Sequence, residues 1–157
     1  MSSAHSSPAI GTGPPYSARC FCGAIRLVAD AEPLSVSYCH CVDCRRATGA
    51  PVAALAAFAS RAVTFSGDPK SAKGTQPGST RTFCPDCGSS LAFHGDYVDD
   101  QTFIHIGLFD ELNHFVPTHH SYDGERATWL KIDDSCDRFA GSSRTALNAA
   151  ALRAQGN

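Results

Sequence analysis

The sequence has few charged residues, no excess of basic ones and no long apolar run, and each absence excludes a class of protein. Asp, Glu, Lys and Arg make up 18% of the 157 residues, which argues against a disordered chain or a coiled coil. The formal net charge is −2, so the basic surface typical of nucleic-acid-binding proteins is not expected. No stretch approaches the roughly 18 consecutive apolar residues of a transmembrane helix, so we expect no membrane partner.

The N-terminal end lacks the apolar core of a secretory signal, which favours a cytoplasmic location. Residues 1–15 are rich in Ser, Pro and Gly, and residues 141–157 are small and polar with a weak helical run. We therefore expect a disordered leader over 1–15, one folded domain over 16–140 and a C-terminal tail over 141–157. Cysteines in a reducing compartment are not expected to pair as disulfides, so metal binding explains them better.

What the sequence does have is clustered cysteine. Seven of the eight cysteines fall into three short segments, which read Cys20-Phe21-Cys22, Cys39-His40-Cys41-Val42-Asp43-Cys44 and Cys84-Pro85-Asp86-Cys87. Four thiolates complete a tetrahedral zinc site, whereas three leave one position for water or a substrate. The clusters therefore predict two zinc ions per chain, one held by four thiolates and the other by three.

The first and third clusters are predicted to share the closed, structural site. Cys84-Pro85-Asp86-Cys87-Gly88 is a zinc knuckle, whose tight turn directs two sulfurs at one metal. It supplies half of a site, and Cys20 and Cys22 can supply the other half. The loop of roughly 60 residues between the halves adds little closure entropy compared with the ~10 kcal/mol that structural zinc contributes.

The middle cluster predicts a different kind of site. Its C-x-C-x-x-C segment places three sulfurs within six residues, close enough to converge on one face of a metal. The local sequence leaves the fourth ligand open between water, a substrate thiol, His40, Asp43, a distant histidine and Cys136.

A zinc ion held by three thiolates has a net charge of −1 and is a weak Lewis acid, because its ligands already donate strongly. Such an ion is less suited to activating water than to holding a fourth thiolate, whose pKa it lowers while the sulfur stays nucleophilic. The middle cluster therefore predicts activation of a thiol for attack on a carbon electrophile, with Cys39, Cys41 and Cys44 at the catalytic centre.

The apolar pattern between the two ends is mostly that of β-strands. Apolar and polar residues alternate over 24–27 and 34–38, and short apolar runs occur at 63–65, 80–83, 91–93 and 103–106. Residues 52–59 suit either a helix or a buried strand, and we favour the strand. Residues 45–48 predict a short helical turn closed by Gly49. The sequence thus predicts a mostly β, antiparallel fold with little helix.

The chain resembles the glutathione-dependent formaldehyde-activating enzyme and centromere protein V family in the order of its motifs. These are C-x-C-G-A, C-H-C-x-x-C-R-R, F-C-x-x-C-G, a distal His120 and a Trp-Leu-Lys segment, over about residues 16–140. The resemblance implies a β-tent fold of antiparallel sheets. It also implies a structural zinc on Cys20, Cys22, Cys84 and Cys87, and a functional zinc on Cys39, Cys41 and Cys44.

The resemblance implies an activity as well. The enzyme that names the family adds glutathione to formaldehyde, giving S-hydroxymethylglutathione, and is classed as a carbon–sulfur lyase for the reverse step. A small-molecule thiol and a small aldehyde are therefore the expected partners. The chain departs from the family pattern at Thr128, where a Pro is common, and just ahead of Arg138-Phe139, where Cys136 lies outside the pattern.

Three further residues are candidates for substrate binding. Arg45 and Arg46 directly follow the middle cluster and could hold the carboxylates of glutathione, or could instead be exposed and offset the negative metal cluster. His40 lies between two predicted ligands and could move a proton or bind a ligand sulfur, or could simply pack beside the site. Trp129, the only tryptophan, is expected in the core.

The alternative to an enzyme is a zinc-stabilised protein-interaction module without turnover, as the centromere-associated members suggest. The slightly acidic balance and the absence of basic runs in both tails weaken a nucleic-acid partner for such a module. A third interpretation is a redox or metal sensor in which Cys136 is the reactive thiol.

Overall fold

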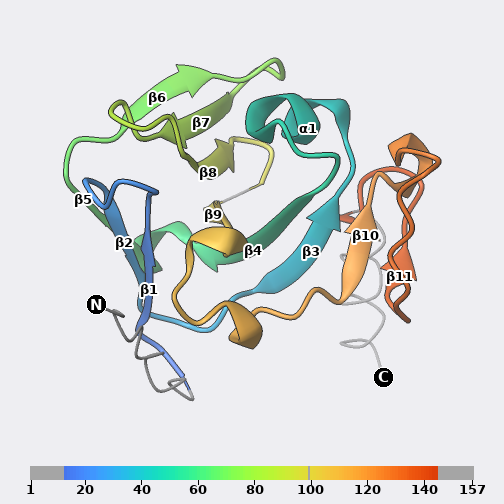
Figure 1. The fold of residues 1–157 in the computed structure, drawn as a ribbon, viewed down its shortest axis with the longest axis horizontal. Coiled ribbons are helices and arrows are strands. Elements are labelled where there is room, and N and C mark those ends of the chain that lie inside the picture. The colour runs from blue at the N-terminus through green and yellow to red at the C-terminus, as the bar shows by residue number, and fades with distance from the viewer. Residues whose placement is uncertain (1–12, 99, 145–157) are drawn as a thin grey trace, which may run out of the picture.

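A computed structural model describes residues 13–98 and 100–144 of the protein, which form two β-sheets and one short helix (Figure 1). The smaller sheet has the strand order β1-β2-β5 and the larger one the order β11-β10-β3-β4-β9-β8-β7-β6. The strands are β1 (Tyr16–Arg19), β2 (Arg26–Ala29), β3 (Ser35–Cys39), β4 (Ala53–Ala59), β5 (Val63–Ser66), β6 (Lys70–Lys73), β7 (Ser79–Phe83), β8 (Ser90–Gly95), β9 (Gln101–His105), β10 (His119–Ser121) and β11 (Asp137–Arg138).

The helical content is small, as predicted. Helix α1 spans Val42–Thr48, and single 3₁₀ turns occur at Ser60–Ala62, Ile106–Leu108, Leu112–His114 and Asp123–Glu125. The mostly β fold is therefore confirmed. Pairing within each sheet is antiparallel except at one edge, where β10 lies parallel to both β3 and β11. Sequence periodicity shows that a segment is a strand but carries no information on its direction, so this mixed edge was not predicted.

The two faces of the larger sheet have different roles. One row of paired residues, Val36, Ala56, Ile104 and Ala92, is fully or almost fully buried in the main core. Residues of the smaller sheet, such as Tyr16 and Leu27, belong to the same core. The core thus lies against one face of the larger sheet, which leaves the opposite face available for a site.

Helix α1 leaves β3 directly and covers part of that second face. It begins at Val42, with Cys41 as its N-cap, and ends at Thr48. Gly49 has φ of +70°, a left-handed conformation that glycine adopts without strain, and its N–H donates to the carbonyl of Arg45. The predicted turn closed by Gly49 is confirmed, and the helix starts three residues earlier than predicted.

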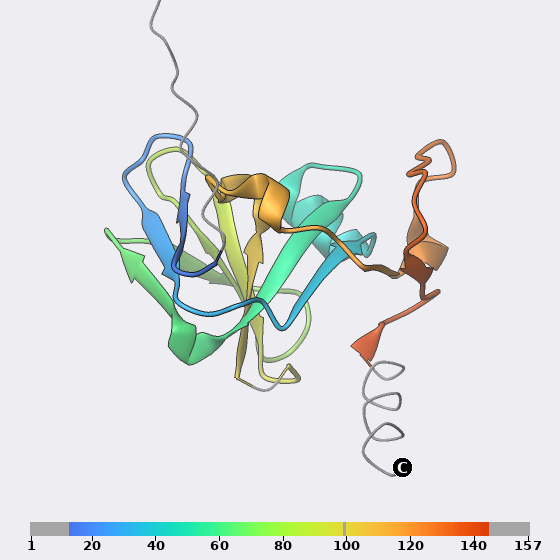
Figure 2. The same ribbon diagram turned by 90° about the horizontal axis from the view of Figure 1, so that it is seen from below.

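The edge formed by β10 and β11 lies on the side of the molecule opposite the smaller sheet, as Figures 1 and 2 show. Trp129, in the segment between these two strands, is 71% exposed, so its predicted place in the core was wrong. Several ion pairs hold this segment, among them those of Arg138 with Asp123 and Asp134. The strand prediction for 52–59 was confirmed by β4.

Most of the predicted leader and tail, residues 1–12 and 145–157, lie outside the described residues. Residues 141–144 are described, and they contact the β10 edge: Gly141 accepts a hydrogen bond from the Tyr122 N–H, and Ser143 accepts one from Ser121. None of the described helices has the length and apolar character needed to cross a membrane.

Candidate metal centres

Four cysteines from two distant turns converge, as predicted. The Sγ atoms of Cys20, Cys22, Cys84 and Cys87 all lie within 4.8 Å of one another. Cys20 and Cys22 sulfurs are 3.5 Å apart, and Cys22 and Cys84 sulfurs 3.8 Å apart. Sulfurs at the corners of a tetrahedron around zinc lie about 3.8 Å apart, given Zn–S bonds of about 2.3 Å. The group therefore fits a tetrahedral metal.

The backbone of both turns supports these sulfurs. Cys20 follows β1 and its sulfur accepts a hydrogen bond from the Ile25 N–H at 3.2 Å. Cys84 follows β7, and the knuckle closes where the Gly88 N–H donates to the Cys84 carbonyl. The Ser89 hydroxyl, 3.2 Å from the Cys87 sulfur, lowers the pKa of that thiol to about 5. The four-cysteine site thus joins the β1–β2 turn of one sheet to the β7–β8 turn of the other.

The middle cluster forms a second group at the junction of β3 and α1. Cys39 is the last residue of β3, Cys41 caps α1 and Cys44 lies inside its first turn, with all three sulfurs within 4.8 Å of one another. The Cys41 sulfur accepts the Cys44 N–H at 3.3 Å. Within 13–98 and 100–144, no other His, Cys, Asp or Glu joins this group of three.

The three sulfurs influence one another's protonation. Hydrogen bonds from the Cys39 and Cys41 thiols, assisted by Arg81, lower the pKa of Cys44 to about 3. The same contacts, together with burial, raise the pKa of Cys39. Without a cation the group holds one thiolate and two thiols, so a metal is needed for all three to be ionised together.

A cavity of about 1010 Å³ opens at the three-cysteine site. Cys39, Cys41 and Cys44 all line it, whereas none of the four cysteines of the other site is among its lining residues. Its floor is the second face of the larger sheet, which contributes Leu55, Phe93 and Phe103. Pockets for small ligands have volumes of about 300–1,000 Å³, so the cavity has room for a substrate beside the three sulfurs.

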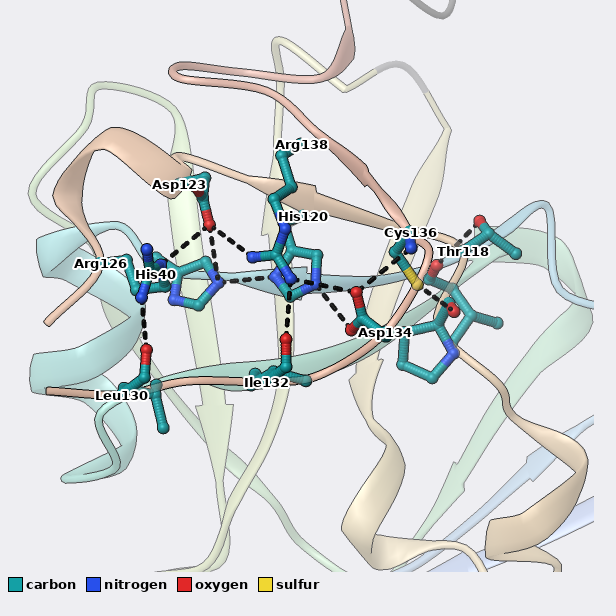
Figure 3. Close-up of polar contacts among 12 residues, drawn as sticks. His40, Thr118, His120, Asp123, Arg126, Leu130, Ile132, Asp134, Cys136 and Arg138 are labelled. Atoms are coloured by element: carbon teal, nitrogen blue, oxygen red, sulfur yellow. Dashed lines mark hydrogen bonds and ion pairs between the residues drawn. The ribbon is translucent and has the colours of Figure 1, made fainter. Parts of the chain in front are cut away.

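A buried pair of histidines, shown in Figure 3, includes His40, which lies between Cys39 and Cys41 in the chain. His40 and His120 are both fully buried, their rings are stacked, and His40 Nε2 is 2.9 Å from His120 Nδ1. His120 Nε2 is 2.9 Å from Asp134 Oδ2. Because the ionised carboxylate only accepts, His120 Nε2 carries a proton, and one further proton joins His40 Nε2 to His120 Nδ1. Burial, followed by the neighbouring His120, lowers the pKa of His40 and keeps it neutral.

Two arginines complete this network. Arg138 donates to both Asp123 and Asp134 at 3.0 Å, and Arg126 donates to Asp123 at 3.2 Å and to the carbonyl of Leu130. Figure 3 shows these side chains gathered around the two histidine rings. The network ties the segment 122–138 to β3 and β10, and its carboxylates are already neutralised by arginine.

Cys136 belongs to this network and not to the three-cysteine site. Its thiol donates to the carbonyl of Pro117 at 3.1 Å. Its sulfur lies within 4.8 Å of a ring nitrogen of His120 and a carboxylate oxygen of Asp134. Of the fourth ligands that the sequence left open, the structure therefore offers no protein side chain among the described residues.

Comparison with known proteins agrees with this geometry. The sequence model of the family described as glutathione-dependent formaldehyde-activating enzyme matches residues 15–125. The chain belongs to this family. The resemblance inferred from the cysteine motifs is thereby confirmed.

The chain is similar to two further proteins. A Schizosaccharomyces pombe protein named an uncharacterized lyase is 26% identical over 134 residues, covering 85% of this chain and 90% of its own length. A crystal structure of a Rhodobacter sphaeroides protein is 20% identical, covers 59% of this chain and 85% of its own, and superposes with a TM-score of 0.47.

The predicted substrate residues of this formaldehyde-activating-enzyme family member lie outside the cavity wall. Arg45 is half-buried and Arg46 exposed on α1, and neither lines the cavity. His40 is buried behind the site and does not line it either. Direct contact of these three residues with a substrate stays a prediction.

Sequence reasoning missed the residues that do form the wall, including Arg81, Tyr97 and Tyr122. Arg81 lies on β7, the strand that leads into the third cluster. Its position near the middle cluster depends on the pairing of β7, β8, β9 and β4, which no local pattern reveals.

Proposed function

We propose that the protein is a carbon–sulfur lyase-type enzyme that adds a glutathione-like thiol to a small, formaldehyde-like aldehyde. The observation that carries this proposal is the three-cysteine group opening onto a cavity, with no fourth protein ligand among the described residues. Membership of the family and the lyase-named relative support it. A cytoplasmic location, where glutathione is abundant, goes with the proposal.

Two zinc ions per chain are part of the proposal. Cys20, Cys22, Cys84 and Cys87 would hold the structural ion, and Cys39, Cys41 and Cys44 the functional one. The functional ion would supply positive charge that lowers the pKa of a substrate thiol. Both sulfur groups fit zinc in donor type and spacing.

The overall reaction is an addition across a carbonyl group. The thiol loses its proton, an S–C bond forms, the electron pair of the C=O π bond moves to oxygen, and that oxygen takes up a proton. The reverse reaction breaks the S–C bond and releases thiol and aldehyde. Neither direction changes an oxidation state, so no redox partner is required.

The cavity wall contributes hydrogen-bond donors and an apolar surface. Burial raises the pKa of both Tyr97 and Tyr122, so their phenols stay protonated and can donate hydrogen bonds. Phe93 and Phe103, whose ring centroids are 5.6 Å apart, cover the sheet beside the sulfurs. These rings give the cavity an apolar floor.

The test is exchange between glutathione, formaldehyde and their adduct, followed by NMR because the uncatalysed reaction also proceeds. The zinc-loaded protein is expected to speed the exchange, and Cys44→Ser to abolish that acceleration. Cys136→Ser serves as the matched control, because Cys136 lies outside both sulfur groups. No acceleration by the wild type over the uncatalysed rate would contradict the enzyme and favour the interaction module.

A further inference from the structure

Arg81 is a cation of the cavity wall that contacts one of the three sulfurs. Arg81 lies on β7 directly opposite Phe93 of β8, and its guanidinium carbon is 4.8 Å from the centre of that ring. A cation over an aromatic face is held in place by the ring's negative π-surface. Phe93 is in turn paired with Phe103 of β9. The strand register therefore fixes the guanidinium over an apolar floor.

The two ends of that guanidinium have different surroundings. Arg81 Nη2 donates to the Cys44 sulfur at 3.5 Å. Arg81 Nη1 is buried and has no hydrogen-bond partner in the described part of the chain. A buried donor without an acceptor is costly, and on a charged group more so. Because Arg81 lines the cavity, a ligand bound there is a source of the missing acceptor.

No carboxylate of the described residues neutralises Arg81 by a salt bridge, although six arginine or lysine ion pairs occur elsewhere among those residues. His105 adds no second positive charge beside Arg81, because burial, followed by the charge of Arg81, lowers the pKa of His105 to about 4. Arginine itself does not deprotonate in proteins. Arg81 is thus a permanent cation. One end of its guanidinium donates to a sulfur, and the other end carries a donor that has no acceptor among the described residues.

We propose that Arg81 Nη1 binds the oxygen of the aldehyde and stabilises the negative charge that gathers there as the S–C bond forms. This inference rests on the proposed function. The electron pair leaves the C=O π bond for the oxygen, Arg81 donates a hydrogen bond to that oxygen, and the proton that completes the hydroxyl comes from solvent or a cavity phenol. Arg81 keeps all of its own protons throughout.

The number of covalent bonds from the attacking sulfur favours the aldehyde oxygen, and not a carboxylate of glutathione, as the group that Arg81 binds. The aldehyde oxygen is two bonds from the attacking sulfur, whereas each carboxylate of glutathione is several bonds further away. Arg81 lies within hydrogen-bonding reach of a sulfur of the cluster, so it is beside the reacting atoms and not at the far end of the thiol. A donor aimed at a developing oxyanion contributes about 10²–10³ in rate.

The first experiment compares the zinc-loaded wild type with Arg81→Met and Arg81→Lys. Arg81→Met is expected to reduce the catalysed exchange rate by about 10²–10³-fold at saturating glutathione, with two zinc ions and the glutathione dissociation constant unchanged. Arg81→Lys should recover part of the rate. Arg61→Met is the matched control, because Arg61 is an exposed arginine that does not line the cavity.

Three results would overturn the proposal. Loss of the second zinc in Arg81→Met would show that Arg81 serves only to offset the charge of the thiolates. Weaker binding of glutathione, with an unchanged rate at saturation and unchanged binding of 2-mercaptoethanol, would assign Arg81 to a carboxylate. An unchanged rate and unchanged binding of glutathione would show that Arg81 acts in neither catalysis nor binding.

The second experiment needs no turnover and separates this inference from the proposed function. Formate labelled with ¹³C is a one-carbon oxyanion of the size of the aldehyde, and its NMR line width is measured with zinc-loaded protein. We expect broadening with the wild type and Arg61→Met, and none with Arg81→Met. Broadening without any catalysed exchange would refute the enzyme while keeping the oxyanion site, whereas no broadening with active wild type would refute the role of Arg81 alone.

Discussion

The two sulfur groups are built from the same residue type but differ in what surrounds them. The four-cysteine group joins turns that are about 60 residues apart along the chain, and it links the smaller sheet to the larger one. The three-cysteine group comes from one segment of six residues and faces a cavity. The four-cysteine group therefore connects distant parts of the chain, and the three-cysteine group lies at the candidate site.

The two groups thus differ in their surroundings as well as in their number of sulfurs. Backbone N–H and serine groups surround the four sulfurs. A permanent cation, two phenols and an apolar floor surround the three. Substitutions in and around the two groups test this contrast.

Replacing a buried cysteine of the closed group, Cys84→Ser, should have the largest effect. Because this group joins the two sheets, loss of its metal removes the contact that holds the first strands to the rest of the chain. We expect loss of the cooperative unfolding transition and of both metals, measured by circular dichroism and elemental analysis. A Cys84→Ser protein that unfolds at the wild-type temperature would contradict the structural role.

Replacing a cysteine of the open group, Cys44→Ser, should remove function and leave the fold. Zinc content is expected to fall from two ions to one and catalysed exchange to vanish, while the circular dichroism spectrum stays that of the wild type. The reason is that residues 39–44 close no long loop. Global unfolding of this variant would show that the two groups do not differ in the way described.

The buried histidine pair should contribute to stability at an intermediate level. His120→Leu leaves His40 Nε2 without its partner in a fully buried position. We expect the free energy of unfolding to fall by about 1–3 kcal/mol, measured by denaturant titration. His94→Leu is the matched control, since that side chain is 44% exposed, and its effect should be smaller.

The same contact predicts a pH dependence. The hydrogen bond from His120 holds the pKa of Asp134 below its ordinary value in the folded protein. The stabilisation is therefore present above the ordinary pKa of an aspartate and is lost as pH falls through the lowered one. The stability difference between wild type and His120→Leu should shrink in acid, and a difference that grows there would contradict the contact.

The smallest effect is expected for Cys136→Ser. Zinc content, fold and exchange rate should all match those of the wild type, because Cys136 bonds to the Pro117 carbonyl away from both groups. A thiol titration of the zinc-loaded protein should find one cysteine in the wild type and none in Cys136→Ser. Loss of a zinc ion from this variant would place Cys136 in the second site.

The sequence was sufficient for the sulfur groups and for most strands. Clustered cysteines carry their own geometry, since C-x-x-C and C-x-C-x-x-C spacings restrict where the sulfurs can point. Alternation likewise located β3, and Gly49 located the end of α1. In these cases the information is local.

What the sequence did not reveal depends on tertiary pairing. Arg81 reaches Cys44 only because β7 is aligned with β8 and β9 across the sheet. Trp129 was placed in the core because of its size, yet its segment is held by the ion pairs of Asp123, Asp134 and Arg138. Long-range register and buried polar networks of this kind leave no periodic signal in one sequence.

The most direct test of the contrast between the two groups is zinc X-ray absorption before and after glutathione is added. Four and three cysteine ligands shared by two ions give an average of about 3.5 sulfurs per zinc. We predict that glutathione raises this average to about 4 in the wild type and in Cys136→Ser. An average of four sulfurs before glutathione is added, or one that glutathione does not change, would contradict an open three-cysteine centre.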